Sequence, residues 1–286
     1  GDSFVANLQS PLEQTIGKQI EKKLNNKKPG IKIEVISIGL GDTGSMQQFL
    51  ALKEIGLKYN PDLVIQLFLT ANDIKNNSLN LQGDPYRDYY TLIGDKLILL
   101  PKKEENKSIL TKVKIQLKKL KSVEKILYIK QIYNESKKAN NNIPIDYQIY
   151  ESKLNLDYQK AWDITQKLIL ETKKASDQTN ANYLLVTLAN NEQVNAQVLQ
   201  ELQAKYPYLK TKEIDLENPD KLVENFCKKN SIDCMRLLPI FKQYSKENIY
   251  SPTHFKYDGH WNSIGINIAS SAISDYLFEN NYFSTK

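Results

Sequence analysis

The hydrophobic positions of the chain follow two spacings that alternate along the sequence. Apolar residues three or four positions apart predict amphipathic helices, and short apolar runs rich in β-branched residues predict buried strands. The predicted helices cover residues 12–24, 46–57, 162–174, 194–205, 219–229 and 264–278. The predicted strands cover residues 31–36, 63–69 and 183–188, and residues 233–238 predict a final strand or an extended segment. This alternation indicates βαβ units and a parallel sheet covered by helices on both faces.

The stretch from about residue 83 to 155 departs from this alternation. Residues 91–100 predict a β-hairpin that turns at Gly94-Asp95. Residues 108–138 then predict a long helix, and residues 101–138 contain twelve lysines against four glutamates. We favour a helix packed on the domain with its lysines in solvent. The alternative is a lid, or a helix that lies on a membrane surface.

Length and composition limit the class of protein. The 286 residues can bury a substantial core, so we predict one domain, residues 1–286, with a mainly helical insertion at about residues 83–155. No apolar stretch approaches the roughly 20 residues that a membrane-spanning helix requires. The net charge of +6 arises from lysine, with arginine only at positions 87 and 236. Nucleic-acid readers use arginine forks and aromatic platforms, and neither is clustered in this sequence. No nucleic-acid partner is therefore expected.

Cys227 and Cys234 are the only cysteines, and they lie seven residues apart. This spacing matches neither a zinc pair nor a redox motif. Two free buried thiols are the favoured interpretation. A disulfide is the alternative for an oxidising compartment.

Candidate catalytic residues stand at the two ends of the chain. The sequence opens Gly1-Asp2-Ser3, and near its end it reads Asp258-Gly259-His260-Trp261. A serine hydroxyl needs an adjacent base, and the base needs an orienting group. We therefore predict Ser3 as the nucleophile, His260 as the general base and Asp258 as the group that orients the imidazole. The other histidine, His254, is interpreted as structural or as a pocket wall.

Two further segments lie between these ends. Residues 39–44 form a glycine-rich turn, and Thr70-Ala71-Asn72-Asp73 follows the strand predicted at 63–69. The four segments, in this order, resemble the SGNH (GDSL) hydrolase superfamily over nearly the whole chain. The resemblance implies an α/β fold, a three-layer flavodoxin-like sandwich, and an esterase that forms an acyl-serine intermediate. The Asp-x-His-Trp spacing is similar to that of SGNH-like proteins that modify polysaccharide O-acetyl groups.

The resemblance also implies the groups that stabilise the reaction's oxyanion. They are the backbone N–H of Ser3, the backbone N–H of Gly41 and the side chain of Asn72, with Gly39 or Gly44 as register alternatives for the glycine. The family usually has glycine where this chain has Ala71. No metal or organic cofactor is implied.

The expected activity is removal of a small acyl group, acetyl first, from a carbohydrate or lipid ester. One alternative is an O-acyltransferase that modifies a cell-surface glycan with the same residues, and another is a non-catalytic binding module. The family has a strand before the Gly-Asp-Ser segment that this sequence lacks, which favours a fragment of a longer protein. Membrane association, or an extracytoplasmic location, would depend on that preceding segment.

Overall fold

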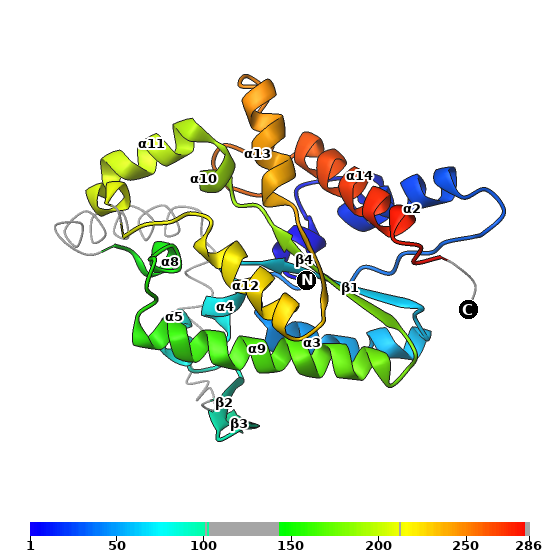
Figure 1. Ribbon diagram of the computed structural model, residues 1–286, viewed down its shortest axis with the longest axis horizontal. Helices are drawn as coiled ribbons and strands as arrows, with labels where there is room; N and C mark the ends of the chain where they lie inside the picture. The colour runs from blue at the N-terminus through cyan, green and yellow to red at the C-terminus, as the bar shows by residue number, and fades with distance from the viewer. Residues whose placement is uncertain (101, 103–142, 212, 284–286) are drawn as a thin grey trace, which may run out of the picture.

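The computed structural model describes residues 1–100, 102, 143–211 and 213–283. They form a mixed α/β protein whose parallel sheet has three strands in the order β1-β4-β5 (Figure 1). The strands are β1 (Leu63–Leu69), β4 (Asn182–Leu188) and β5 (Asp233–Arg236). The register pairs Leu63 with Asn182, and Leu184 with Asp233.

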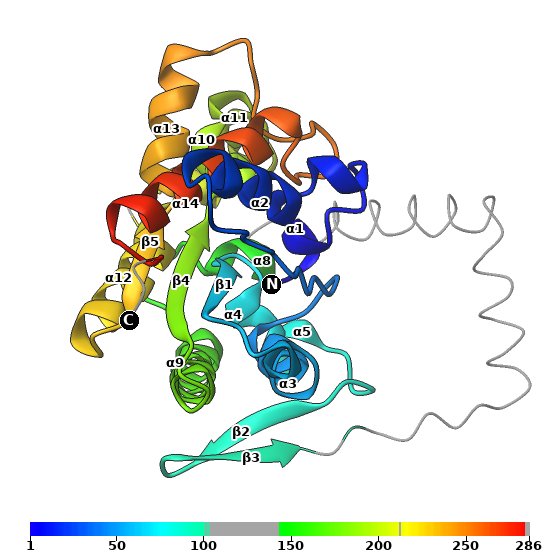
Figure 2. The same ribbon diagram turned by 90° about the vertical axis from the view of Figure 1, so that its right-hand side faces the viewer.

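Successive side chains of the strands enter two hydrophobic clusters, because neighbouring residues of a strand point to opposite faces. Leu67 and Val186 belong to the cluster that also contains residues of α2 (Ile16–Lys27), α13 (Leu238–Glu247) and α14 (Ser263–Glu279). Phe68 and Leu185 belong to the cluster that contains residues of α9 (Leu156–Asp177) and α12 (Asn218–Lys229). Figure 2 shows α2, α13 and α14 above the strands and α9 below them.

The other described elements are short or lie outside this sheet. The helical ones are α1 (Ser3–Ala6), η1 (Leu12–Gln14), α3 (Ser45–Glu54), η2 (Gly56–Tyr59), α4 (Asp73–Asn76), α5 (Leu79–Gln82), α8 (Ile145–Gln148), α10 (Asn191–Val194), α11 (Ala196–Lys205) and η3 (Pro207–Lys210). The hairpin strands β2 (Tyr89–Ile93) and β3 (Lys96–Leu100) pair antiparallel. Tyr90, Leu92 and Leu97 of this hairpin pack against α3 and α9.

Most predicted elements are confirmed, with shifted ends. The first long helix begins at Ile16 instead of residue 12, and it buries Ile16, Ile20 and Leu24 as the spacing predicts. The hairpin turns at Gly94, whose φ of 58° is the left-handed conformation that glycine adopts easily. The helix predicted at 108–138 lies outside the described residues. Within the described ranges, no helix is both long enough and apolar enough to cross a membrane.

The strand predicted at 31–36 is wrong. This segment has no strand partner in the part of the chain that the structure describes. Side chains of α2 bind its backbone instead. Asn25 donates to the carbonyl of Ile33 at 2.7 Å and accepts from its N–H at 2.9 Å, and Glu21 accepts from the N–H of Val35 at 2.7 Å. These contacts satisfy backbone N–H and C=O groups that would otherwise pair with a neighbouring strand.

Two further boundaries differ from the prediction. The strand predicted at 233–238 ends at Arg236, and helix α13, which the pattern did not predict, begins at Leu238. Pro239 lies in its first turn, where the fixed φ of proline suits a helix and no N–H is needed. The helix predicted at 194–205 is interrupted at Asn195, whose side chain accepts from two backbone N–H groups of α11.

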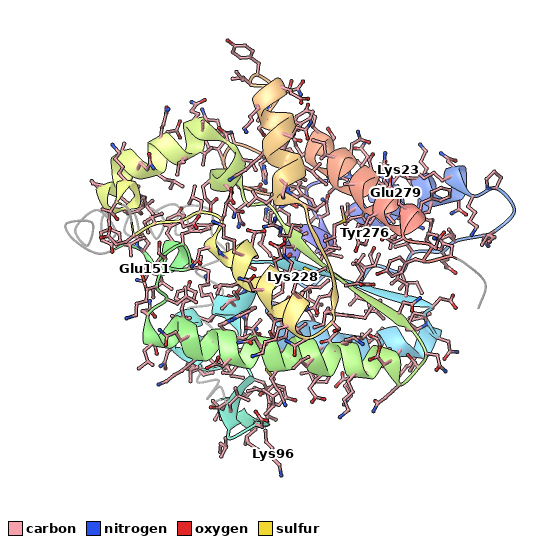
Figure 3. The ribbon with its side chains drawn as sticks, in the orientation of Figure 1. Lys23, Lys96, Glu151, Lys228, Tyr276 and Glu279 are labelled. Carbon is pink, nitrogen blue, oxygen red and sulfur yellow. The ribbon has the colours of Figure 1, made fainter. Side chains whose placement is uncertain are left out.

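Helices α2 and α14 lie side by side and support the end of the chain. Lys23 donates to Asn267 at 2.8 Å, and Lys27 forms an ion pair with Asp275. Figure 3 labels Lys23 of α2 and Tyr276 and Glu279 of α14 on the same side of the molecule, where both helices lie. The segment that carries His260 leads directly into α14. The contacts between α2 and α14 therefore hold the end of that segment in place.

Candidate active site

Ser3 is the first residue of α1, and the turn before it is fixed by Asp2. The Asp2 carboxylate accepts from the N–H of Phe4 at 2.9 Å, so Asp2 caps this helix. Gly1 is packed against β1, because a Cβ atom at this position would lie 3.0 Å from the carbonyl oxygen of Leu67. The serine therefore lies beside the carboxyl half of β1, where open α/β sheets bind ligands.

His260 lies on a loop whose two ends are joined by backbone hydrogen bonds. His254 and Trp261 form an antiparallel bridge, and the N–H of Phe255 donates to the carbonyl of His260 at 2.8 Å. Gly259, with a φ of 75°, forms the bend next to His260. Figure 2 shows this loop, just before α14, beside the N-terminal segment.

Trp261 anchors this loop in the core. Its side chain is fully buried, stacks on Phe241 with ring centroids 5.2 Å apart, and meets Phe4 edge-on at 5.1 Å. Phe4, which follows Ser3, also lies 4.9 Å from the His260 ring. The aromatic contacts thus join the segment of Ser3 to the segment of His260.

Trp261→Ala is expected to destabilise the protein by about 3–5 kcal/mol, because it removes a large buried ring and leaves a cavity. Urea unfolding followed by circular dichroism measures this loss. Tyr257→Ala is the control on the same loop, since Tyr257 is 93% exposed. Equal and small effects of both substitutions would show that Trp261 does not hold the loop.

The structure brings Ser3 and His260 into contact although they are 257 positions apart. The Nε2 atom of His260 lies 2.8 Å from the Oγ atom of Ser3. On the other side of the ring, Nδ1 lies 3.5 Å from Oδ1 of Asp258 and 3.2 Å from Nε2 of Gln9. Asp258 Oδ1 also accepts from the backbone N–H of His260 at 3.0 Å. The Gln9 contact could not be predicted from the sequence, because no periodicity or spacing relates a loop glutamine to a distant histidine.

Asn72 and the glycine-rich turn also lie next to the Ser3 segment. Asn72 Nδ2 donates to Oδ2 of Asp2 at 3.1 Å, and the N–H of Leu40 donates to the carbonyl of Gly1 at 3.1 Å. Among hydrogen bonds between described residues, the backbone N–H groups of Ser3 and Gly41 donate none. Both N–H groups are thus without an acceptor among the described residues.

The three candidate glycines have different surroundings. A Cβ atom at Gly39 would lie 2.1 Å from the backbone N of Ala6, and one at Gly44 would lie 2.6 Å from Oδ1 of Asn77. At Gly41 nothing lies within 4 Å of such an atom. Gly39 and Gly44 therefore serve close packing, whereas Gly41 borders open space.

Two buried carboxyl groups lie beneath the site. Asp73 is fully buried and accepts from Gln48 at 3.2 Å and from the N–H of Leu69 at 3.1 Å. Burial, with the nearby Asp2 carboxyl as a second cause, raises the pKa of Asp73 well above its usual value. Burial also raises the pKa of Asp2. Asp73 ties the end of β1 to α3 and so fixes the segment that carries Asn72.

His254 is a buried histidine with partners for both ring nitrogens. Its side chain lies with Nδ1 2.9 Å from Oγ1 of Thr253 and Nε2 3.1 Å from the carbonyl oxygen of Ala189. A carbonyl only accepts, so Nε2 carries the proton and Nδ1 accepts from the threonine hydroxyl. Burial lowers the pKa of His254 to about 4. These contacts agree with the structural role expected from the sequence.

The lowered pKa of His254 predicts a pH-dependent stability. Between the unfolded pKa of about 6.5 and the folded pKa of about 4, the unfolded chain binds a proton that the folded protein does not. Relative to His254→Gln, the wild type should therefore lose up to about 3 kcal/mol as pH falls through this window. Urea unfolding of both proteins at several pH values measures the difference. Burial raises the pKa of Asp220 to about 6. Asp220 titrates in both proteins, so its contribution cancels in the difference between their unfolding free energies.

The difference in unfolding free energy between wild type and His254→Gln should be constant above about pH 6.5, where histidine is neutral in both states. A difference that stays constant down to pH 4 would contradict the assigned burial effect.

Cys227 and Cys234 are free thiols in the structure and contact each other. The hydrogen bond with Cys234, followed by burial, raises the pKa of the Cys227 thiol. Among the residues described, no group of three or more His, Cys, Asp or Glu side chains is arranged to hold a metal ion.

Comparison with known proteins leaves the family of this chain open. No family model matches the chain, and no curated protein matches it. One solved structure that is similar is an acetyl xylan esterase, AlAXEase, with 14% sequence identity and a TM-score of 0.49. The superposition covers 98% of this chain and 96% of that chain.

Proposed function

We propose that this protein is a serine esterase of the SGNH type, with the three-layer sandwich typical of that superfamily, and that it hydrolyses small acyl esters. The contact of 2.8 Å between Ser3 Oγ and His260 Nε2 carries this proposal. A serine and a histidine at hydrogen-bond distance form the reacting pair of a nucleophilic hydrolase. The pair stands at the carboxyl end of a parallel strand, where the fold binds ligands.

The reaction follows from this pair. Ser3 Oγ attacks the ester carbonyl while His260 Nε2 takes its proton, and the protonated imidazole then gives that proton to the leaving alcohol. Water attacks the acyl-serine with the same assistance and releases the acid. Asp258, next to Nδ1, stabilises the imidazolium that forms in each step.

The oxyanion of each tetrahedral intermediate is bound by the N–H groups of Ser3 and Gly41 and by the side chain of Asn72. The free N–H groups of the two backbone positions support these roles. For Asn72, the bond to Asp2 uses one hydrogen of its amide nitrogen and leaves the second for the substrate.

Asn72→Ala is therefore expected to lower kcat for ester hydrolysis by about 100- to 1000-fold, as loss of one oxyanion donor typically does. Initial rates with an acetyl ester measure the effect. Asn80→Ala, at an exposed asparagine eight positions further along the chain, is the control and should keep wild-type kcat. Equal rates for the two variants would remove Asn72 from the oxyanion site.

A polar ester substrate, such as an acetylated sugar, fits the surroundings of the pair. Thr70 Oγ1, Asn72 Oδ1 and Asn191 Oδ1 are buried without a partner among the described residues. Thr70 follows β1, and Asn191 begins α10 just after β4, so both lie at the carboxyl edge of the sheet. Buried polar atoms without partners favour a ligand that supplies hydrogen bonds.

A fluorophosphonate probe tests the proposal directly. We expect the folded protein to be labelled on Ser3, identified by mass spectrometry of its peptide, and Ser10 in the same segment to stay unlabelled. No labelling of a protein whose circular dichroism is that of a folded chain would overturn the esterase. Labelling with acetyl transfer to an added sugar in preference to water would identify an acyltransferase instead.

A further inference from the structure

The Nδ1 atom of His260 has two neighbours, and the nearer one is not the aspartate. Gln9 Nε2 lies 3.2 Å from Nδ1, whereas Asp258 Oδ1 lies 3.5 Å away. Hydrogen bonds between N and O atoms span roughly 2.7–3.2 Å, so the aspartate is beyond bonding distance. Its Oδ1 is already bound to the backbone N–H of His260.

Gln9 reaches the histidine from an exposed loop between α1 and η1. Asn7, in the left-handed conformation with a φ of 43°, turns the chain out of α1, and Ser10 N–H donates back to the Asn7 carbonyl at 3.1 Å. Within the described chain, His260 is the one side chain that hydrogen-bonds the Gln9 amide. The Gln9 side chain therefore makes no second hydrogen bond, within the described chain, that would explain its position.

The orientation of this amide has a chemical consequence. A neutral imidazole carries one proton, and a base at Nε2 requires that proton on Nδ1. An NH₂ group facing Nδ1 requires Nδ1 to be unprotonated, which places the proton on Nε2, where it is donated to Ser3. Rotation of the amide by a half-turn exchanges its O and N atoms, which occupy almost the same positions. The carbonyl oxygen Oε1 then accepts from Nδ1–H.

We infer that Gln9 is a positioning residue that sets the tautomer of His260. With Oε1 facing Nδ1, the ring holds its proton on Nδ1 and Nε2 is free to accept the proton of Ser3. With Nε2 of Gln9 facing Nδ1, the ring is in the other tautomer and is not a base. This role rests on the proposed esterase function and adds to it a residue on the second side of the imidazole.

Other ionisable groups also act on the ring. Asp2 faces it from the turn before α1, Asp258 from its own loop, and His254 from the core side. Asp258 is the one of these near Nδ1, and it favours a proton there as Gln9 Oε1 does. The experiment must therefore separate Gln9 from Asp258.

The chain is well suited to a direct measurement, because His254 and His260 are its only histidines. Protein labelled with ¹⁵N-histidine gives four ring-nitrogen NMR signals, and His254→Gln assigns them. His254 is an internal reference for the Nε2–H tautomer, since its Nε2 donates to a carbonyl. For neutral His260 in the wild type we expect the Nδ1–H tautomer.

Gln9→Leu should shift His260 toward the Nε2–H tautomer and lower kcat about tenfold with little change in KM. Gln9→Glu, which keeps an acceptor at this position, should restore the Nδ1–H tautomer. Gln14→Leu, an exposed glutamine of the same segment, is the matched control and should change neither.

Three results would overturn the inference: an Nε2–H tautomer in the wild type, an unchanged tautomer in Gln9→Leu, or a shift caused by Asp258→Asn and not by Gln9→Leu. The NMR measurement needs no turnover. A protein without esterase activity would therefore refute the proposed function and still show whether Gln9 sets the tautomer.

Discussion

Ser3→Ala should lower kcat for acetyl-ester hydrolysis by about ten-thousand- to a million-fold, because the substitution removes the proposed nucleophile. The oxyanion donors and the substrate contacts remain, so a small rate above that of water should persist. Initial rates with p-nitrophenyl acetate and with an acetylated oligosaccharide measure the loss. Since Ser3 is partly exposed, the thermal midpoint Tm should change little.

Ser10→Ala is the matched control for this experiment, because it removes a hydroxyl from the same N-terminal segment. It should keep wild-type kcat and KM. A Ser3→Ala protein that retains activity within about tenfold of wild type would assign the nucleophile to another residue.

The predictions that rest on local pattern agree best with the structure. The run at residues 63–69 is β1 over the same residues, and the spacing of Ile16, Ile20 and Leu24 gave the buried face of α2. Strand and helix periodicity are set by backbone geometry, so they can be read before any tertiary contact is known. The alternation of elements also predicted a parallel sheet, and β1 and β4 do pair in parallel.

The errors occur in segments whose secondary structure is decided by tertiary contacts. Residues 31–36 have a strand-like composition, but Asn25 and Glu21 of α2 bind the backbone that a neighbouring strand would bind. Strand propensity describes a residue that fits a half-buried surface and does not supply the partner. The pattern did not predict helix α13, because Leu237 and Leu238 resemble the end of the strand predicted at residues 233–238.

The candidate site shows the same division. Motif order suggested that Ser3 and His260 would meet, and the structure places them in contact. The orientation of the imidazole could not be predicted from the sequence. It depends on the Gln9 loop and on the 3.5 Å distance between Nδ1 of His260 and Oδ1 of Asp258. The Asp2–Asn72 hydrogen bond was likewise hidden, because each residue alone is an ordinary helix-capping type.

Trp261 explains why the histidine segment can be both near the surface and well positioned. Its buried ring holds one end of the loop in the core, while Asn262 caps α14 through the N–H groups of Ile264 and Gly265. A Cβ atom at Gly265 would lie 2.3 Å from the carbonyl oxygen of Thr253, so the loop and the helix start are tightly packed. Rigid support of this kind is what a general base requires for a fixed geometry.

The two histidines provide the sharpest test of the assigned base. His260→Ala should lower kcat by about ten-thousand- to a million-fold, as loss of the base in a serine hydrolase does, because Ser3 loses the acceptor of its proton. His254→Gln should lose stability and keep kcat within about tenfold, because both nitrogens of His254 bind groups of the core. Rates are compared well below the Tm of each variant, so that unfolding does not mimic loss of chemistry. Equal losses of kcat in two folded variants, or near-full activity in His260→Ala, would show that His260 is not the base.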